Sequence, residues 1–167
     1  MSSASFAQVR VAFFEMKDPT GVRVELEPGG QFFHVALQLK DGSWIHTHPY
    51  YGVQVVEDLR KIGEPKSMLA SALWREIDRE KIFHELGKPF DFKFRWFDPE
   101  TTYCSKLVGQ LLGLSPLPSS FSGAIWKSLD LDATNPVGLS PDDLFYLLLS
   151  NGFKIERPRS CESQLSS

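Results

Sequence analysis

Four residues of this chain could together carry out nucleophilic chemistry: one cysteine and three histidines. The cysteine is Cys104, and the histidines His34, His46 and His48 lie close together in one strand-like part of the sequence. A thiolate attacks carbonyl carbon when a histidine can take the thiol proton and a third polar group orients that histidine. The residue types therefore allow Cys104 as nucleophile, His34 as base and His46 as orienting group, with His48 as the alternative third residue.

Cys104 stands where a helix is predicted to begin. The apolar residues that follow it recur at helical spacing, and Thr101 or Thr102 could cap the first free amides. The positive end of a helix lowers the pKa of a thiol and so favours the thiolate. A lone cysteine on an apolar helix face is, however, more often a small core residue, and on this stretch alone the structural interpretation is favoured.

The three histidines fall in one predicted β-hairpin, formed by residues 32–39 and 43–48. If the turn between the strands has three residues, with Gly42 in a left-handed conformation, all three imidazoles project from the same face. A two-residue turn would instead move His46 to the opposite face, among apolar side chains. We expect the three-residue turn because an imidazole among apolar side chains would be buried without a partner.

The same histidines allow a second kind of site. His46 and His48, two positions apart on a strand, could hold zinc if His34 or Cys104 completed the set. No cluster of cysteine or acidic residues accompanies them in the sequence. We therefore expect no metal and no other cofactor. The fourth histidine, His84, lies among charged residues and is predicted to face solvent.

Length, composition and charge limit the kinds of protein that this chain can be. The chain has 167 residues, of which 42% are hydrophobic, and it is predicted to form one domain over residues 1–157 followed by a disordered polar tail at 158–167. A net charge of -3 with no basic face argues against a nucleic-acid partner. No signal peptide or integral membrane segment is evident, and the two cysteines, Cys104 and Cys161, form no disulfide framework. A cytoplasmic location is expected.

The N-terminal third has the pattern of an antiparallel meander. Apolar or alternating segments at 8–14, 22–26 and 52–56 flank the histidine hairpin, and short turns rich in Gly, Pro and Asp separate them. The first two of these segments are predicted to form a hairpin of their own. Since such short connections cannot support parallel crossovers, the sheet is expected to be antiparallel.

The remainder of the chain is predicted to be mostly helical. A charged helix around residues 77–86 stops at Gly87, and the stretch 67–74 before it is interpreted as a separate turn. The aromatic stretch 90–97 is interpreted as irregular chain that packs into the core. Ser140 has the pattern of an N-cap, with proline and an acidic residue after it as in a capping box, and one last short strand is expected after that helix.

The order of these segments resembles the YiiX/YebB-like proteins, which are the circularly permuted branch of the NlpC-type papain-like superfamily and include relatives of lecithin retinol acyltransferase. The resemblance covers about residues 30 to 148 and rests on the combination of short segments. They are, in chain order, Phe33-His34-Val35-Ala36-Leu37, Trp44-Ile45-His46, Gly52-Val53, Gly87-Lys88-Pro89-Phe90-Asp91, Tyr103-Cys104-Ser105-Lys106-Leu107-Val108 and Ser140-Pro141-Asp142-Asp143-Leu144.

The resemblance implies an α+β protein with a permuted papain-like (NlpC-type) fold, in which a small antiparallel sheet packs against helices. It also implies that Cys104 is the nucleophile, His34 the base and His46 the third polar residue. In the unpermuted peptidases the segment that matches Gly87–Asp91 carries a tyrosine whose hydroxyl helps to bind the oxyanion. Here Phe90 stands in its place and offers no donor. The absence of a signal peptide argues against periplasmic peptidoglycan as the substrate.

These expectations combine into one leading hypothesis. The protein is expected to be a cysteine-dependent hydrolase or acyltransferase that acts on an amide or ester through an acyl-enzyme. Its substrate would be a small molecule, a peptide or a lipid-like compound, and Tyr103, Trp44 and Phe90 are the residues that could line the substrate cleft. One alternative is a papain-like binding module without turnover. The other, less favoured, is a metal-binding protein that uses the three clustered histidines.

Overall fold

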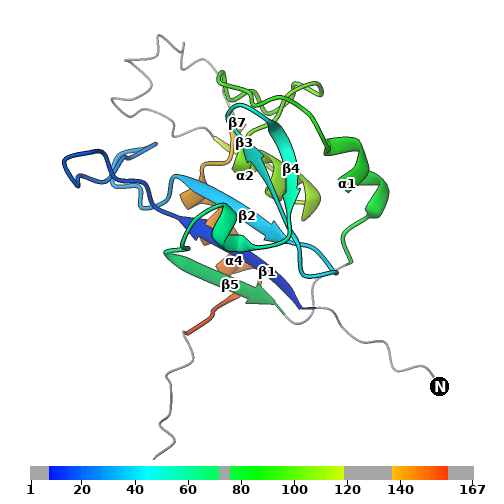
Figure 1. Cartoon of the computed structure of the whole chain (residues 1–167), viewed down its shortest axis with the longest axis horizontal. Coiled ribbons are helices and arrows are strands. Elements are labelled where there is room, and N and C mark those ends of the chain that lie inside the picture. The colour runs from blue at the N-terminus through cyan, green and yellow to red at the C-terminus, as the bar shows by residue number, and fades with distance from the viewer. Residues whose placement is uncertain (1–7, 72–75, 119–136, 158–167) are drawn as a thin grey trace, which may run out of the picture.

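A six-stranded antiparallel sheet forms the centre of the protein. The computed structural model describes residues 8–71, 76–118 and 137–157, and the predicted tail at 158–167, with Cys161, lies outside them. The strands follow the order β4-β3-β2-β1-β5-β8 across the sheet (Figure 1). Their bounds are Val9–Phe14 (β1), His34–Gln38 (β2), Trp44–His48 (β3), Gly52–Val56 (β4), Ser67–Ser71 (β5) and Lys154–Ile155 (β8).

Among the described residues, three α-helices and one 3-10 helix accompany this sheet. They are η1 (Leu59–Lys61), α1 (Arg79–Glu85), α2 (Cys104–Leu111) and α4 (Pro141–Ser150). A pair of two-residue strands, β6 (Leu117–Pro118) and β7 (Val137–Gly138), forms a small separate ladder. The α+β class and the antiparallel sheet packed against helices are therefore as predicted. Within the described residues no helix is long and apolar enough to cross a membrane.

Side chains on the two faces of the sheet enter different clusters. One face packs against α2 and α4 and forms the main core, to which β2 and β3 contribute Val35, Leu37 and Ile45. The other face carries a smaller cluster built on Ala36 and Trp44, against which the residues around η1 pack. Because side chains alternate along a strand, even-numbered residues of β2 and β3 face the small cluster and odd-numbered residues face α2.

The predicted histidine hairpin has the three-residue turn. Leu37 pairs with Ile45, and Gly42 adopts a φ of 89°, which is the left-handed conformation that the turn requires. The capping box of α4 is also as predicted, because the Ser140 side chain accepts from the backbone of Asp143 and the Asp143 side chain accepts from that of Ser140.

Two segments differ from the sequence prediction. Residues 22–26 form no strand, and their pairing with the preceding segment is an isolated bridge between Lys17 and Arg23. The physical reason is that both edges of β1 are already occupied, one by β2 and the other by β5. Strand β5 is the second difference, because the stretch predicted as a turn at 67–74 supplies it. Leu69 of β5 is fully buried in the main core.

The segment that leads into Cys104 is fixed by close backbone contacts. Gly52 opens β4 with a φ of 69°, and a Cβ there would lie 2.2 Å from the carbonyl oxygen of Lys88. The amide of Val53 donates to that same oxygen at 2.9 Å. Phe90 and Thr102 then form a parallel bridge. The strand that carries His46 is thus connected through β4 and the Lys88–Phe90 segment to the residues that precede Cys104.

Candidate active site

The imidazoles of His34 and His46 are hydrogen-bonded to each other. Nε2 of His34 lies 3.0 Å from Nδ1 of His46, and the two rings meet edge to face. Their residues come from neighbouring strands, and the hairpin register makes them diagonal neighbours on one face. The structure therefore brings together the predicted base and the predicted orienting residue, His34 and His46.

A glutamine that the sequence analysis did not single out extends this pair. Gln54 lies opposite His46 in the β3–β4 ladder, and its side-chain amide nitrogen is 3.0 Å from Nε2 of His46. A carboxamide can present either an N–H or a carbonyl oxygen. If the oxygen faces His46, then His46 holds its proton on Nε2, accepts at Nδ1 from Nε2–H of His34, and leaves Nδ1 of His34 free to act as a base. The β3–β4 register, once predicted, would have identified Gln54.

His48 belongs to a different set of contacts. Its Nδ1 accepts from the backbone amides of Tyr50 and Tyr51 at 3.1 and 3.3 Å, and its ring stacks on that of Tyr51. Its ring centroid is 6.4 Å from that of His46. His48 thus stabilises the β3–β4 turn, and His46 rather than His48 is the partner of His34.

Burial keeps both paired imidazoles neutral. His46 is 4% exposed, and desolvation followed by the neighbouring charge of His48 lowers its pKa to about 4. Desolvation, and then the charges of His46 and His48, lowers the pKa of His34 to about 3. A neutral imidazole can accept a proton, whereas an imidazolium cannot. The resting pair is therefore in the protonation state that a general base needs.

Cys104 is the first residue of α2, as predicted, but the pKa of its thiol is raised rather than lowered. The residue is 5% exposed, and burial raises the pKa of its thiol to about 11. Hydrogen bonds from the Val35 amide, and then from Ser105, lower this pKa without offsetting the desolvation. The predicted lowering of the pKa by the helix end is thus wrong, because a buried thiolate loses far more hydration than the first helical turn returns.

The residues before Cys104 do not cap the helix with their side chains. The N-cap is Tyr103, which makes no side-chain capping hydrogen bond. Thr102 is held instead by its backbone, whose amide donates to Pro89 and whose carbonyl accepts from Asp91. The predicted capping by Thr101 or Thr102 is therefore wrong. The first amides of α2 consequently carry no side-chain cap.

Cys104 and His34 approach the same end of the hairpin from opposite faces of the sheet. His34 packs on Phe14 on the face of the small cluster, with ring centroids 5.7 Å apart, whereas Cys104 belongs to the main core with Val35. The β2–β3 ladder consists of the Leu37 and Gln38 pairs, so the two strands are no longer paired at the level of Val35. Since the Val35 amide bonds to the thiol, Cys104 lies beside this unpaired end of the hairpin.

A buried lysine that the sequence analysis did not assign to the site fixes the approach to α2. Lys106 is 2% exposed, and its ammonium group donates to the carbonyl oxygens of Arg95, Asp98 and Thr101 at 2.9, 2.6 and 2.9 Å. All three donors of the ammonium group are thereby used. From its position on α2, Lys106 thus fixes the loop that precedes Cys104.

Of the three residues predicted as candidates for a substrate cleft, two lie in the core. Tyr103 is fully buried, and its hydroxyl accepts from the Leu139 amide at 3.3 Å. Trp44 is 4% exposed in the small cluster. Phe90 is half-buried and contacts Phe92 and Phe94 edge to face or tilted. Phe90 alone of the three reaches the surface to a substantial extent.

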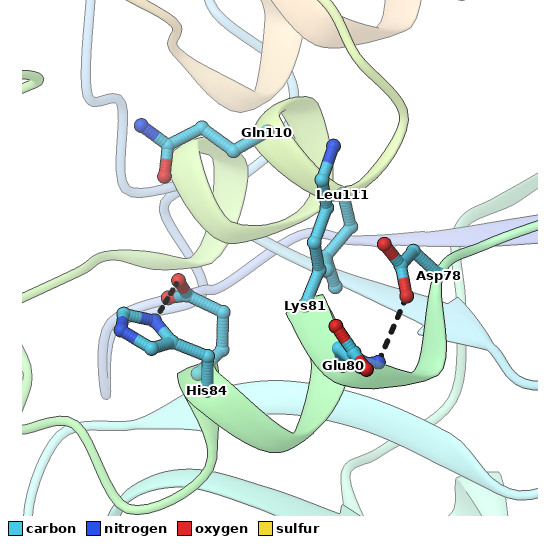
Figure 2. Close-up of a pocket in the computed structure, with 7 residues that line it drawn as sticks. Asp78, Glu80, Lys81, His84, Gln110 and Leu111 are labelled. Atoms are coloured by element: carbon cyan, nitrogen blue, oxygen red, sulfur yellow. Dashed lines mark hydrogen bonds and ion pairs between the residues drawn. The ribbon is translucent and has the colours of Figure 1, made fainter.

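A separate pocket lies at the other end of α2. It has a volume of about 470 Å³ and opens between α1 and α2 (Figure 2). Most of its lining side chains are charged or polar, and they are Asp78, Glu80, Lys81, His84, Glu85, Gln110 and Leu111. The pocket meets α2 at its last two residues, whereas Cys104 is the first, so the two sites are distinct. His84 is exposed there, as predicted.

Comparison with known proteins identifies the fold and leaves the activity open. The chain matches the crystal structure of the metalloprotein yiiX from Escherichia coli O157:H7 with a TM-score of 0.59 and 14% sequence identity, over 92% of this chain and 97% of that chain. At this identity the match shows a shared fold. No protein-family model matches the chain, and no curated protein matches it significantly.

The clustered histidines do not fit a shared metal ion. His34 and His46 are hydrogen-bonded to each other, and the second nitrogen of His46 is hydrogen-bonded to Gln54. Nδ1 of His48 accepts hydrogen bonds from two backbone amides. In the part of the chain that the structure describes, no group of three or more His, Cys, Asp or Glu residues is placed to hold a metal. The zinc alternative that uses these histidines therefore lacks the convergence of ligands that it needs.

Proposed function

We propose that this protein is a cysteine-dependent hydrolase or acyltransferase of the permuted papain-like type. One observation carries the proposal: the His34–His46–Gln54 chain of hydrogen bonds begins at His34, the residue before Val35, and the Val35 amide hydrogen-bonds to the Cys104 thiol. A thiol, an oriented neutral imidazole and a helix N-terminus are the parts that acyl transfer to sulfur needs. The fold shared with yiiX and the order of segments in the sequence are consistent with it.

The reaction starts from a neutral Cys104 thiol and a neutral His34 imidazole rather than from a thiolate–imidazolium ion pair. Nδ1 of His34 would reach the thiol through the unpaired end of the β2–β3 hairpin. As Cys104 Sγ bonds to the carbonyl carbon, the thiol proton moves to His34, and the carbonyl oxygen becomes an oxyanion near the uncapped amides of α2. The proton then passes to the leaving alcohol or amine, and water or an amine resolves the acyl-enzyme. The acyl group would come from an amide or an ester.

Gln54 would act as a positioning residue in this scheme. The structure places the Gln54 nitrogen toward His46. With the carboxamide turned so that its carbonyl oxygen faces His46, Gln54 selects the tautomer in which Nδ1 of His34 is free. Glutamate at position 54 can only accept when ionised, so Gln54→Glu would hold that tautomer permanently. The variant is therefore expected to keep or raise the activity, whereas Gln54→Lys, which can only donate, would lower it.

The test is the hydrolysis of activated acyl esters, measured in a Cys161→Ser background in which Cys104 is the sole thiol. We expect Cys104→Ala to abolish the hydrolysis and His34→Gln to reduce kcat/KM by roughly 10²- to 10⁴-fold. His84→Gln, a change of an exposed histidine outside the chain of hydrogen bonds, is the matched control and should leave the rate unchanged. Equal rates for the His34 and His84 variants would refute the assignment of the base.

A binding module without turnover is the second candidate. Two observations favour it: the thiol is buried with a raised pKa, and Phe90 supplies no oxyanion donor. In this case a ligand would bind equally to the wild type and to Cys104→Ser, with no acyl transfer in either. Burst release of the leaving group by the wild type alone separates the two candidates.

A further inference from the structure

Thr47 is a buried polar residue without an evident structural use. It is fully buried on β3, and among the described residues its hydroxyl is one of three buried side-chain oxygens without a hydrogen-bond partner. An unsatisfied buried hydroxyl destabilises a fold, whereas valine has the same shape and a high propensity for strands. The position therefore keeps a hydroxyl where an isosteric apolar residue would be more stable, and such a group calls for an explanation.

The sheet register places this hydroxyl at the Cys104 site. Thr47 pairs with Val53 on β4, and Thr47 and Val35 each lie two residues beyond the Leu37–Ile45 pair, at the end of the hairpin where β2 and β3 are no longer paired. Both valines belong to the same core cluster as Cys104. Thr47 is an odd-numbered residue of β3, like Ile45, so its side chain faces α2 and not the histidines. It thus lies at the same unpaired end of the hairpin as Val35, the residue whose amide bonds to the thiol.

Two other side-chain hydroxyls near Cys104, those of Tyr103 and Ser105, are already engaged. The Tyr103 hydroxyl accepts from the Leu139 amide, and the Ser105 hydroxyl donates to the Leu139 carbonyl oxygen at 2.6 Å. The neighbours of Thr47 in the sheet, Val35 and Val53, have apolar side chains. The sulfur of Cys104 is therefore an acceptor in this region that the Thr47 hydroxyl can serve once the sulfur becomes charged.

We propose that the Thr47 hydroxyl donates a hydrogen bond to the Cys104 thiolate and, together with the Val35 amide and Ser105, forms a cradle of donors for the sulfur. The proton that leaves Sγ goes to Nδ1 of His34, and Thr47 keeps its own proton. Only a rotation of the Thr47 side chain and its hydroxyl is required. The cradle stabilises the charged sulfur that a dry site would otherwise disfavour. The proposal deepens the proposed function and rests on Cys104 acting as a nucleophile.

The test compares Thr47→Val with Thr47→Ser in the Cys161→Ser background. Iodoacetamide labelling of Cys104 is followed near pH 9, at urea concentrations where the rate does not depend on urea, so that the folded protein is measured. Since a hydrogen bond to a charged group shifts a pKa by about one unit, Thr47→Val should label about tenfold more slowly. Thr47→Ser should restore the rate.

The same variants give a second readout that an ordinary structural threonine would not give. Thr47→Val should raise the melting temperature by roughly 2–4 °C, because it removes an unsatisfied hydroxyl. An unchanged labelling rate in Thr47→Val, or a lowered melting temperature, would overturn the proposal. Labelling needs no turnover. If Thr47→Val slows labelling while no ester is hydrolysed, the proposed reaction fails and the cradle stands.

Discussion

The state of the resting thiol is the most informative property to measure, because it separates this site from one with a preformed ion pair. The structure predicts a neutral thiol: burial raises the pKa of Cys104 to about 11, while His34, with a pKa of about 3, supplies no positive charge. In a preformed ion pair the thiol would be ionised well below neutral pH. The two arrangements thus differ by many orders of magnitude in thiolate at neutral pH.

The magnitude follows from these pKa values. At about pH 9 a thiol of pKa about 11 is roughly 1% ionised, whereas an ordinary cysteine of pKa about 8.5 is roughly 75% ionised. Thiolate absorbs near 240 nm, so its fraction can be read as the difference in absorbance between Cys161→Ser and the double variant that also carries Cys104→Ser. We expect no thiolate signal between pH 6 and 9 in the folded protein.

The unfolded protein provides the internal control for this measurement. In denaturant the same difference spectrum should rise with a midpoint near about pH 8.5, since burial no longer opposes ionisation. A full thiolate signal at neutral pH in the folded protein would refute the reasoning, because it would require a positive charge beside Cys104 that none of the described residues supplies.

Three further predictions concern the scaffold and the imidazoles. Gly52→Ala should lower the unfolding free energy by about 3 kcal/mol or more in urea unfolding, since its Cβ would meet a carbonyl oxygen at 2.2 Å. The control is Gly42→Ala, which has open space around its Cβ and should cost about 1 kcal/mol. Equal losses in the two variants would contradict this. Lys106→Met leaves three backbone carbonyls without their donor and should lower the unfolding free energy by about 3 kcal/mol, and a loss below about 1 kcal/mol would show that the ammonium contacts are dispensable. His34 and His46 have folded pKa values of about 3 and 4, below the ordinary value of 6.5, so between these values each imidazole binds a proton only after the protein unfolds. The unfolding free energy should therefore be complete above about pH 6.5 and fall toward pH 4 by about 1.4 kcal/mol per pH unit for each imidazole. A flat profile of unfolding free energy from pH 7 to 5 would disprove their burial as neutral groups.

Local signals in the sequence predicted the elements that carry the site. The Gly42 turn determines the hairpin register, and the register in turn places the three histidines on one face. The capping box at Ser140 predicts the start of α4, and the apolar spacing after Cys104 predicts α2. These features depend on a few neighbouring residues and their backbone preferences, so a single sequence contains them.

What the sequence did not predict depends on contacts between distant segments. Strand β5 forms because β1 offers it an edge, and no local pattern in its own residues required a strand. The same applies to the carbonyl oxygens around Lys106 and to the place of Thr47 at the unpaired end of the hairpin, which need the folded loop and the completed sheet. The pKa of Cys104 was mispredicted because helix position is visible in the sequence whereas depth of burial is not.

The central claim is that Cys104 becomes acylated with His34 as the base, and mass spectrometry of the protein trapped during turnover tests it most directly. The Cys161→Ser protein would be mixed with an activated acyl ester, quenched in acid within the burst and digested. We predict one acyl group on the peptide that contains Cys104, its near absence in His34→Gln, and its complete absence in Cys104→Ser. An acyl group of equal yield in the His34 variant, or none on Cys104 in the parent protein, would contradict the account.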